Sequence, residues 1–208
     1  MKKILYLILH TEKHSDRWSN LTQTWLKGRD YLFYSDHQDD SKNILKVTSD
    51  NTYHSNEPKF VNVVTLLPEK YMDYEWYFFV DNDTWVNSNK LEPLLDSFDT
   101  NVLHGSKIYC WPHDKTLGYL SGGAGILIHN NKFKHLKDNF KNYKTGYSDV
   151  SLGYYMRDYN VECVDNELFK SQSPSHYEIS EENIPSYITF HYIKDRDTQL
   201  KYTNLCEL

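Results

Sequence analysis

One short segment, EWYFFVDNDTWVN at residues 75–87, constrains the fold more than any other part of the chain. Five consecutive bulky residues, Trp76 to Val80, are apolar or aromatic, which is typical of a buried strand. Two carboxylates, Asp81 and Asp83, follow at once. Like charges this close repel each other, so the pair costs stability unless a cation or a sharp exit to water resolves the repulsion.

Segments with strand and helix character alternate on the N-terminal side of this run. The expected strands are 3–10, 31–36 and 44–49, and the expected helices are 15–27, which would end at Gly28, and 57–71. This order predicts an α/β fold with a mixed, mostly parallel sheet flanked by helices. Ligands of such sheets bind outside the carboxyl ends of the strands, so Asp81 and Asp83 would face residues from neighbouring strand ends.

Shorter elements are expected in the rest of the chain. The expected helices are 88–98, 131–142 and 148–158, and strands are expected within 101–112, 119–130, 160–165 and 187–193. The predicted N-caps are Ser15, Ser88 or Asn89, and Ser148. The 208 residues favour a single domain, and the polar residues from about 194 predict a loosely attached C-terminal tail.

Charge and cysteine content exclude several classes of protein. The formal net charge is −6 with both signs interspersed, which argues against a nucleic-acid binder. Three scattered cysteines are too few for a disulfide framework or a zinc site, which favours reduced thiols and a cytoplasmic setting. The apolar run Ile4 to Leu9 is too short for a signal-peptide core or a membrane span.

The two acids after the buried strand suit a hard divalent cation. Residues i and i+2 share a side of an extended segment, so both carboxylates can face one Mn²⁺ or Mg²⁺, ions that usually bridge to substrate phosphates. A solvated surface turn is the alternative, because Asp-Asn-Asp is common turn chemistry. An EF-hand calcium loop is set aside, because Trp85 and Val86 stand where it needs an acid or Asn and then Gly.

A glycine-rich turn, Gly122 to Gly125, precedes an apolar segment. Small residues there let a ligand approach the backbone closely, and a donor sugar is the natural candidate. A Walker phosphate loop is excluded because no Lys-Ser/Thr pair follows. The structural alternative is a tight turn or bulge before a strand.

Five motifs, in this order, resemble the Fringe and core-1 β1,3-galactosyltransferase group, glycosyltransferase family 31. They are HTEKHSDRW…TW…FYSD, WYFFVDNDTWV, GYLSGGAGILIHNNKF (118–133), YSDVSLGYYM (147–156) and FHY (190–192), and the resemblance spans about residues 4 to 193. It implies a GT-A-type, Rossmann-like fold and a UDP-sugar donor. It also implies Mn²⁺ (or Mg²⁺), inversion at the anomeric carbon, and a glycan or other hydroxyl acceptor.

The same resemblance implies roles for single residues. Asp81, Asp83 and His191 match the metal site, and Asp149 matches the catalytic base. The residues that match nucleotide-side positions are Thr11, Arg17, Asp36, Lys59 and Asn82. Apart from the resemblance, the small residues of the glycine-rich turn and an aromatic ring that flanks it are expected to contact sugars: Gly122, Gly123, Ala124 and Trp111.

Some of these residues could instead have a purely structural role. His191 in a strand-like run is often an ordinary hydrogen-bonded residue, and Asp149 would suit a helix N-terminus on charge alone. Trp111 would serve equally well in core packing.

The chain departs from the family pattern at several places. Asn82 replaces an acid that many relatives have, and Ser148 precedes Asp149 where relatives often have a second acid. The family's membrane anchor, stem and disulfides are missing, which favours a bacterial or virus-encoded cytoplasmic enzyme. Two other functions stay open: a nucleotidyltransferase acting on a sugar phosphate, and a catalytically inactive glycan-binding module.

Overall fold

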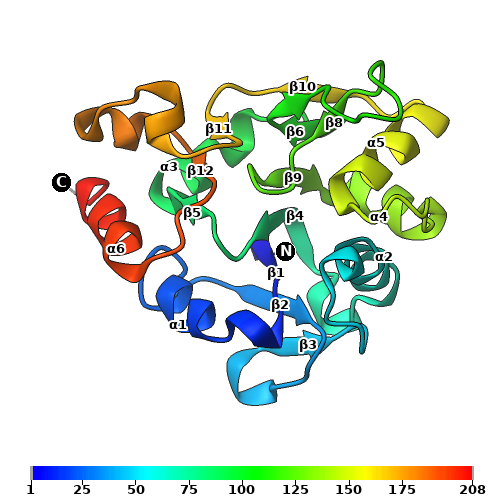
Figure 1. The fold of residues 1–208 in the computed structure, drawn as a ribbon, viewed down its shortest axis with the longest axis horizontal. Coiled ribbons are helices and arrows are strands. Elements are labelled where there is room, and N and C mark those ends of the chain that lie inside the picture. Colours follow the sequence, from blue (N-terminus) through cyan, green and yellow to red (C-terminus); the bar gives the residue numbers. More distant parts are fainter. Residues whose placement is uncertain (1, 208) are drawn as a thin grey trace.

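The computed structural model describes residues 2–207, which form a twisted sheet with helices on both faces (Figure 1). The sheet has seven strands in the order β10-β6-β9-β4-β1-β2-β3. Their bounds are β1 Lys2–Leu9, β2 Tyr31–Ser35, β3 Ile44–Lys46, β4 Tyr74–Asp81, β6 Leu103–Gly105, β9 Ile126–His129 and β10 Cys163–Asp165. Only β9 runs antiparallel to its neighbours, β4 and β6, so the predicted mixed and mostly parallel sheet is confirmed.

Both faces of the central strands are covered. Successive side chains of a strand point to opposite faces, so Leu5 and Leu7 of β1 enter one core while Tyr6 and Ile8 enter the other. The helices are α1 Asp16–Thr22, α2 Asn56–Leu66, α3 Ser88–Leu94, α4 Asn130–Asn139, α5 Ser148–Asp158 and α6 Arg196–Leu205. Helices α2, α4 and α5 pack on the first core, and α1 and α3 on the second. Burial on both faces explains why β4 is continuously apolar.

Two small sheets complete the fold. One joins β11 Phe169–Lys170, β12 Thr189–Phe190 and β5 Trp85–Val86, and the other pairs β7 Lys107–Ile108 with β8 Tyr119–Leu120. The pairing of β5 with β12 is antiparallel and sets Phe190 opposite Trp85. Strands β5 and β11 were not predicted, because two residues carry no measurable periodicity.

Several predicted helix ends and caps are wrong. Helix α2 ends at Leu66 rather than near residue 71, because the residue before Pro68 is driven out of the helical region. Helix α1 ends at Thr22, well before Gly28. Asn87 caps α3 by accepting a hydrogen bond from the Lys90 amide at 3.1 Å. Tyr147 occupies the N-cap of α5, and Ser15 is the N-cap of α1 without a capping side-chain bond.

The predicted loose tail is also wrong, because residues 196–205 form α6. Asp195 caps this helix by accepting from the Thr198 amide at 2.8 Å. Gln199 is buried and donates its Nε2–H to the Ile193 carbonyl at 2.7 Å. The helix lies beside α1 at the left of Figure 1. None of the helices within residues 2–207 has the combination of length and apolar character that a membrane crossing requires.

A buried acid connects α2 to the start of α5. Glu57, with 1% of its surface exposed, accepts from the Gly146 amide at 2.6 Å and from the Ser151 hydroxyl at 2.6 Å. The Thr145 hydroxyl lies 3.3 Å from the same carboxylate. Hydrogen bonds to a charged group are stronger than neutral ones, so Glu57 fixes the loop that leads into α5.

Replacing Glu57 by alanine is therefore expected to lower the free energy of unfolding by about 3 kcal/mol, because the buried Ser151 hydroxyl and the partly buried Gly146 amide lose their acceptor. Urea denaturation followed by circular dichroism measures the loss. Glu69→Ala is the control, since Glu69 is exposed and its side chain makes no hydrogen bond or ion pair within residues 2–207. Equal effects of the two substitutions would contradict the anchoring role of Glu57.

Candidate functional site

The turn after β4 and the segment after β12 meet at one point. Asp81, Asp83 and His191 each offer a ligand atom, and these atoms lie within 4.8 Å of one another. The His191 Nε2 atom is 3.1 Å from Asp83 Oδ1 and 3.8 Å from Asp81 Oδ2. All three side chains are partly buried. The structure thus assembles the three residues that the sequence predicted as metal ligands.

The pKa values of the two acids of this cluster shift in opposite directions. Burial raises the pKa of Asp81 to about 6, and the neighbouring Asp83 and Asp149 charges add to the rise against the effect of His191. Burial acts the same way on Asp83, but the hydrogen bond with His191 and the charges of His191 and Arg17 bring its pKa below the ordinary value. Burial lowers the pKa of His191, yet its bond to Asp83 and the two acids raise it overall.

The surroundings of His191 fit a metal ligand. Two carboxylates and an imidazole form a donor set that Mn²⁺ accepts. The backbone of Ser171 also lies close enough to His191 to raise its pKa. A Cβ built at Gly123 would overlap the His191 ring, so only glycine leaves the ring its place.

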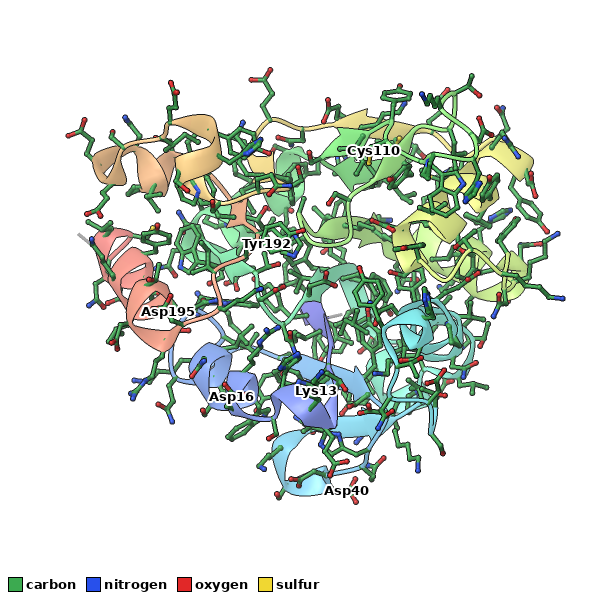
Figure 2. All side chains as sticks on the ribbon, viewed as in Figure 1. Lys13, Asp16, Asp40, Cys110, Tyr192 and Asp195 are labelled. Atoms are coloured by element: carbon green, nitrogen blue, oxygen red, sulfur yellow. The ribbon has the colours of Figure 1, made fainter. Side chains whose placement is uncertain are left out.

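A first cavity of about 370 Å³ opens from this cluster toward α1 and the short 3₁₀ helix Glu12–His14. Its cationic lining residues are Lys13, Arg17, Lys59 and Lys194. Lys13, from the 3₁₀ helix, and Tyr192, from the segment after β12, are labelled in Figure 2 and both line this cavity. Several cations around one opening attract an anion.

The floor of the first cavity is held by a buried polar network. The Thr11 hydroxyl donates to Asp36 Oδ2 at 2.8 Å, and the Glu12 amide donates to Asp36 Oδ1 at 2.9 Å. Lys59 Nζ lies 3.5 Å from Asp36 Oδ2 and donates to the His10 carbonyl at 3.1 Å. Burial opposes ionisation of Asp36, but these donors bring its pKa well below the ordinary value. Asp36 itself does not line the cavity, but it holds the lining residues Thr11 and Lys59 in position.

Asn82 is turned away from the acidic cluster. Its Oδ1 accepts from Arg17 Nη1 at 2.8 Å, and its Nδ2 lies 3.1 Å from His10 Nδ1. Burial and the neighbouring His37 lower the pKa of His10 to about 4, so His10 is neutral near pH 7 and can accept this bond. Arg17 Nη1 also lies 3.6 Å from Asp83 Oδ2, so Asn82 and Asp83 together orient the guanidinium.

A second cavity of about 360 Å³ lies on the other side of the cluster. It shares Asp81, His191, Tyr53 and Tyr192 with the first cavity. Its own lining residues include Gly122, Gly123, Tyr119, Tyr147 and Asp149. Within residues 2–207, no lysine or arginine lines it. The two cavities therefore differ in charge and meet at the acidic cluster.

Asp149 enters the second cavity from the first turn of α5. Its Oδ1 accepts from the Val150 amide at 2.8 Å and its Oδ2 from the Gly122 amide at 3.4 Å. Burial raises the pKa of Asp149, although both backbone bonds act in the opposite direction. An acid with a raised pKa in a cavity is a candidate general base.

The comparison with known families agrees with this arrangement. A family model described as Fringe-like matches residues 1–206. The chain belongs to the Fringe-like family. This membership confirms the resemblance that the ordered motifs indicated.

Solved glycosyltransferases share the fold of this Fringe-like chain over 98% of its length. One is involved in the glycosylation of the major capsid of PBCV-1 (TM-score 0.57, 13% identity, 99% of that chain covered). Another is GlyE of Streptococcus pneumoniae TIGR4 (TM-score 0.54, 13% identity, 61% covered). A third is the galactosyltransferase LgtC, solved with donor and acceptor sugar analogs (TM-score 0.54, 15% identity, 95% covered). The fold is thus GT-A.

Most predicted site residues of the Fringe-like chain lie on the cavity walls, but three do not: Asp36, which lies behind the wall of the first cavity, Ala124 and Trp111. Ala124 is fully buried, and its carbonyl accepts from the Thr189 hydroxyl at 2.6 Å. Trp111 packs edge-on against Tyr147, with ring centroids 5.5 Å apart, and donates to the Tyr154 hydroxyl at 3.2 Å. The predicted sugar contacts of Ala124 and Trp111 are therefore not formed by side chains at either cavity.

Other lining residues were missed. The polar segment after β1 contains Lys13 and His14, and its place at a strand end was an available signal. Lys194 follows the predicted ligand His191 by three residues. Tyr53 and Tyr192 reach the cavities through tertiary packing, which no local pattern in the sequence indicates.

Gly123→Ala is expected to weaken Mn²⁺ binding by about 10-fold or more, because the added methyl displaces the His191 ring. Gly122→Ala is the matched control, since a Cβ there meets nothing closer than 3.7 Å. Titration of free Mn²⁺ by electron paramagnetic resonance measures both variants. Equal affinities for the two variants would count against His191 as a ligand.

Proposed function

We propose that the chain is a metal-dependent inverting glycosyltransferase that moves a sugar from a UDP-sugar to a hydroxyl of a glycan or other acceptor. The observation that carries this proposal is the position of Asp81, Asp83 and His191 where the two cavities meet. A cationic cavity lies on one side of them, and a cavity that contains Asp149 lies on the other. A donor nucleotide and an acceptor would thus meet beside the acidic cluster.

The first cavity suits the nucleoside diphosphate. Lys13, Arg17 and Lys194 offer donors to phosphate oxygens, and Lys59 adds a positive charge beside His10 and Asp36. Bound Mn²⁺ or Mg²⁺ would supply Lewis-acid stabilisation of the leaving diphosphate. Asp81, Asp83 and His191 would hold that ion, and Arg17 would keep Asp83 ionised by its charge.

The second cavity suits the acceptor. Asp149 would take the proton of the attacking hydroxyl while the acceptor oxygen bonds to the anomeric carbon and the bond from that carbon to the diphosphate breaks. Attack from the face opposite the diphosphate inverts the configuration. Tyr119 and Tyr147 offer apolar ring surface beside this position, which suits the face of a sugar.

The alternatives are less well supported. A nucleotidyltransferase would not require an acid in a second cavity, and the Fringe-like family membership does not favour it. A purely binding module would have no use for the assembled cluster of two acids and an imidazole. The cytoplasmic setting and the bacterial or viral origin stay predictions.

UDP binding is expected to require the metal. Isothermal titration calorimetry of UDP with Mn²⁺ should give micromolar affinity, and excess EDTA should abolish it. Asp83→Ala should abolish the Mn²⁺-dependent binding because one of two ligating carboxylates is lost. Asp40→Ala is the control, since Asp40 is exposed and lies at the lower edge of the molecule in Figure 2. UDP binding that is indifferent to Mn²⁺ would contradict the donor assignment.

Asp149→Asn is expected to keep UDP binding but to lower kcat by about 10²-fold or more, because the base is lost. The raised pKa of Asp149 places the acid limb of the wild-type pH profile above the range of an ordinary aspartate, and activity falls as pH falls through it. The residual activity of Asp149→Asn should lack this limb.

Asp158→Asn, at the other end of α5, is the control for this substitution and should retain the wild-type profile. Normal transfer by Asp149→Asn would place the base elsewhere.

A further inference from the structure

The backbone of Tyr192 is strained next to the acidic cluster. Five non-glycine residues within residues 2–207 have positive φ, and of these only Tyr192, at 62°, lines either cavity. A bulky side chain rarely adopts this conformation, which costs of order 1–3 kcal/mol and persists only where the surroundings enforce it. Such strain concentrates at functional sites, so it calls for a specific cause.

The surroundings of Tyr192 enforce the conformation from both sides. On one side, the His191 amide donates to the Lys170 carbonyl of β11 at 3.2 Å. On the other side, the Ile193 amide donates to the Asp83 carbonyl at 2.8 Å, and Gln199 of α6 donates to the Ile193 carbonyl at 2.7 Å. The backbone is therefore fixed before and after Tyr192. The change in backbone direction between these two points is made at Tyr192 itself.

The positive φ of Tyr192 places its ring on the His191 ring. Side chains of consecutive residues in an extended strand point in opposite directions. Here the two rings stack instead, with centroids 3.7 Å apart and planes inclined by 20°. The backbone of Gly123 lies so close to the imidazole that a Cβ there would overlap it. The imidazole thus stacks on the Tyr192 ring and also lies against the backbone of Gly123.

Core packing does not explain the position of Tyr192. The residue is 48% exposed, and its side chain makes no hydrogen bond among those found within residues 2–207. What the stacked ring does restrict is the rotation of His191. In that orientation Nε2 points at Asp83 Oδ1, 3.1 Å away, and lies 3.8 Å from Asp81 Oδ2.

We propose that Tyr192 is a positioning residue that holds the His191 imidazole in the orientation needed for metal binding, and that its strained backbone is part of this device. The proposal rests on the metal site of the proposed function. Tyr192 acts here through His191 and without itself contacting the ion.

The test measures Mn²⁺ affinity by electron paramagnetic resonance on the whole chain without nucleotide. Tyr192→Gly, which removes the ring and relieves the strain, is expected to weaken Mn²⁺ binding about 10-fold, as removal of groups that orient a ligand does. Its Tm is expected not to fall, because glycine adopts positive φ without strain. Tyr192→Phe keeps the ring and is expected to restore the affinity to within about twofold. Glu178→Gly is the matched control, since it relieves similar strain, at φ 54°, on an exposed residue outside both cavities.

A double-mutant cycle with His191→Ala decides whether Tyr192 acts through His191. The expected result is that adding Tyr192→Gly to His191→Ala causes no further loss of Mn²⁺ affinity. An equal loss in both backgrounds, or unchanged affinity of Tyr192→Gly alone, overturns the proposal for Tyr192. Unchanged affinity of His191→Ala, or no Mn²⁺ binding by the wild type, overturns the metal site itself, so the two failures are distinguishable.

Discussion

The antiparallel pairing of β5 with β12 is the contact on which the site depends. It brings together residues 108 positions apart, so that His191 reaches Asp83 at 3.1 Å. The hydrogen bond from the Ile193 amide to the Asp83 carbonyl fixes the same approach from the backbone. Because both strands contain only two residues, their stability comes from Trp85 and Phe190, which are buried and stacked on each other. A buried apolar pair thus holds a polar site in register.

The repulsion between Asp81 and Asp83 is resolved by giving the two acids different surroundings. Asp83 receives a hydrogen bond from His191 and the charge of Arg17, so its pKa falls. For Asp81, burial outweighs the effect of His191 and raises the pKa to about 6. One acid is therefore fully ionised near neutrality, and the other ionises more readily when a cation approaches. The two carboxylates can therefore lie side by side without a metal ion, and a bound metal ion would stabilise both in the ionised form.

The sequence predicted the parts of the site that follow from strand ends and motif order. The long apolar run of β4 located Asp81 and Asp83, and the ordered motifs added Asp149 and His191. The sequence did not reveal Tyr192, because its strain and stacking arise only when β12, β11 and α6 fix the chain around it. The sequence also left open whether Trp111 contacts a sugar or packs in the core, since an aromatic residue on a wall and one behind it have the same local pattern. Local patterns predict where a segment lies, whereas the direction of a side chain depends on tertiary packing.

Helix α2 sets the distance between the two halves of the site. Glu57 and Lys59 lie two residues apart in its first turns, so they point to different sides of the helix. Glu57 holds the loop before α5 and thereby Asp149, whereas Lys59 holds His10 and Asp36 beneath the first cavity. Both side chains are buried, so neither contact is easily broken by solvent. The first and second cavities are thus joined through one helix, and rigid elements place functional groups more accurately than loops do.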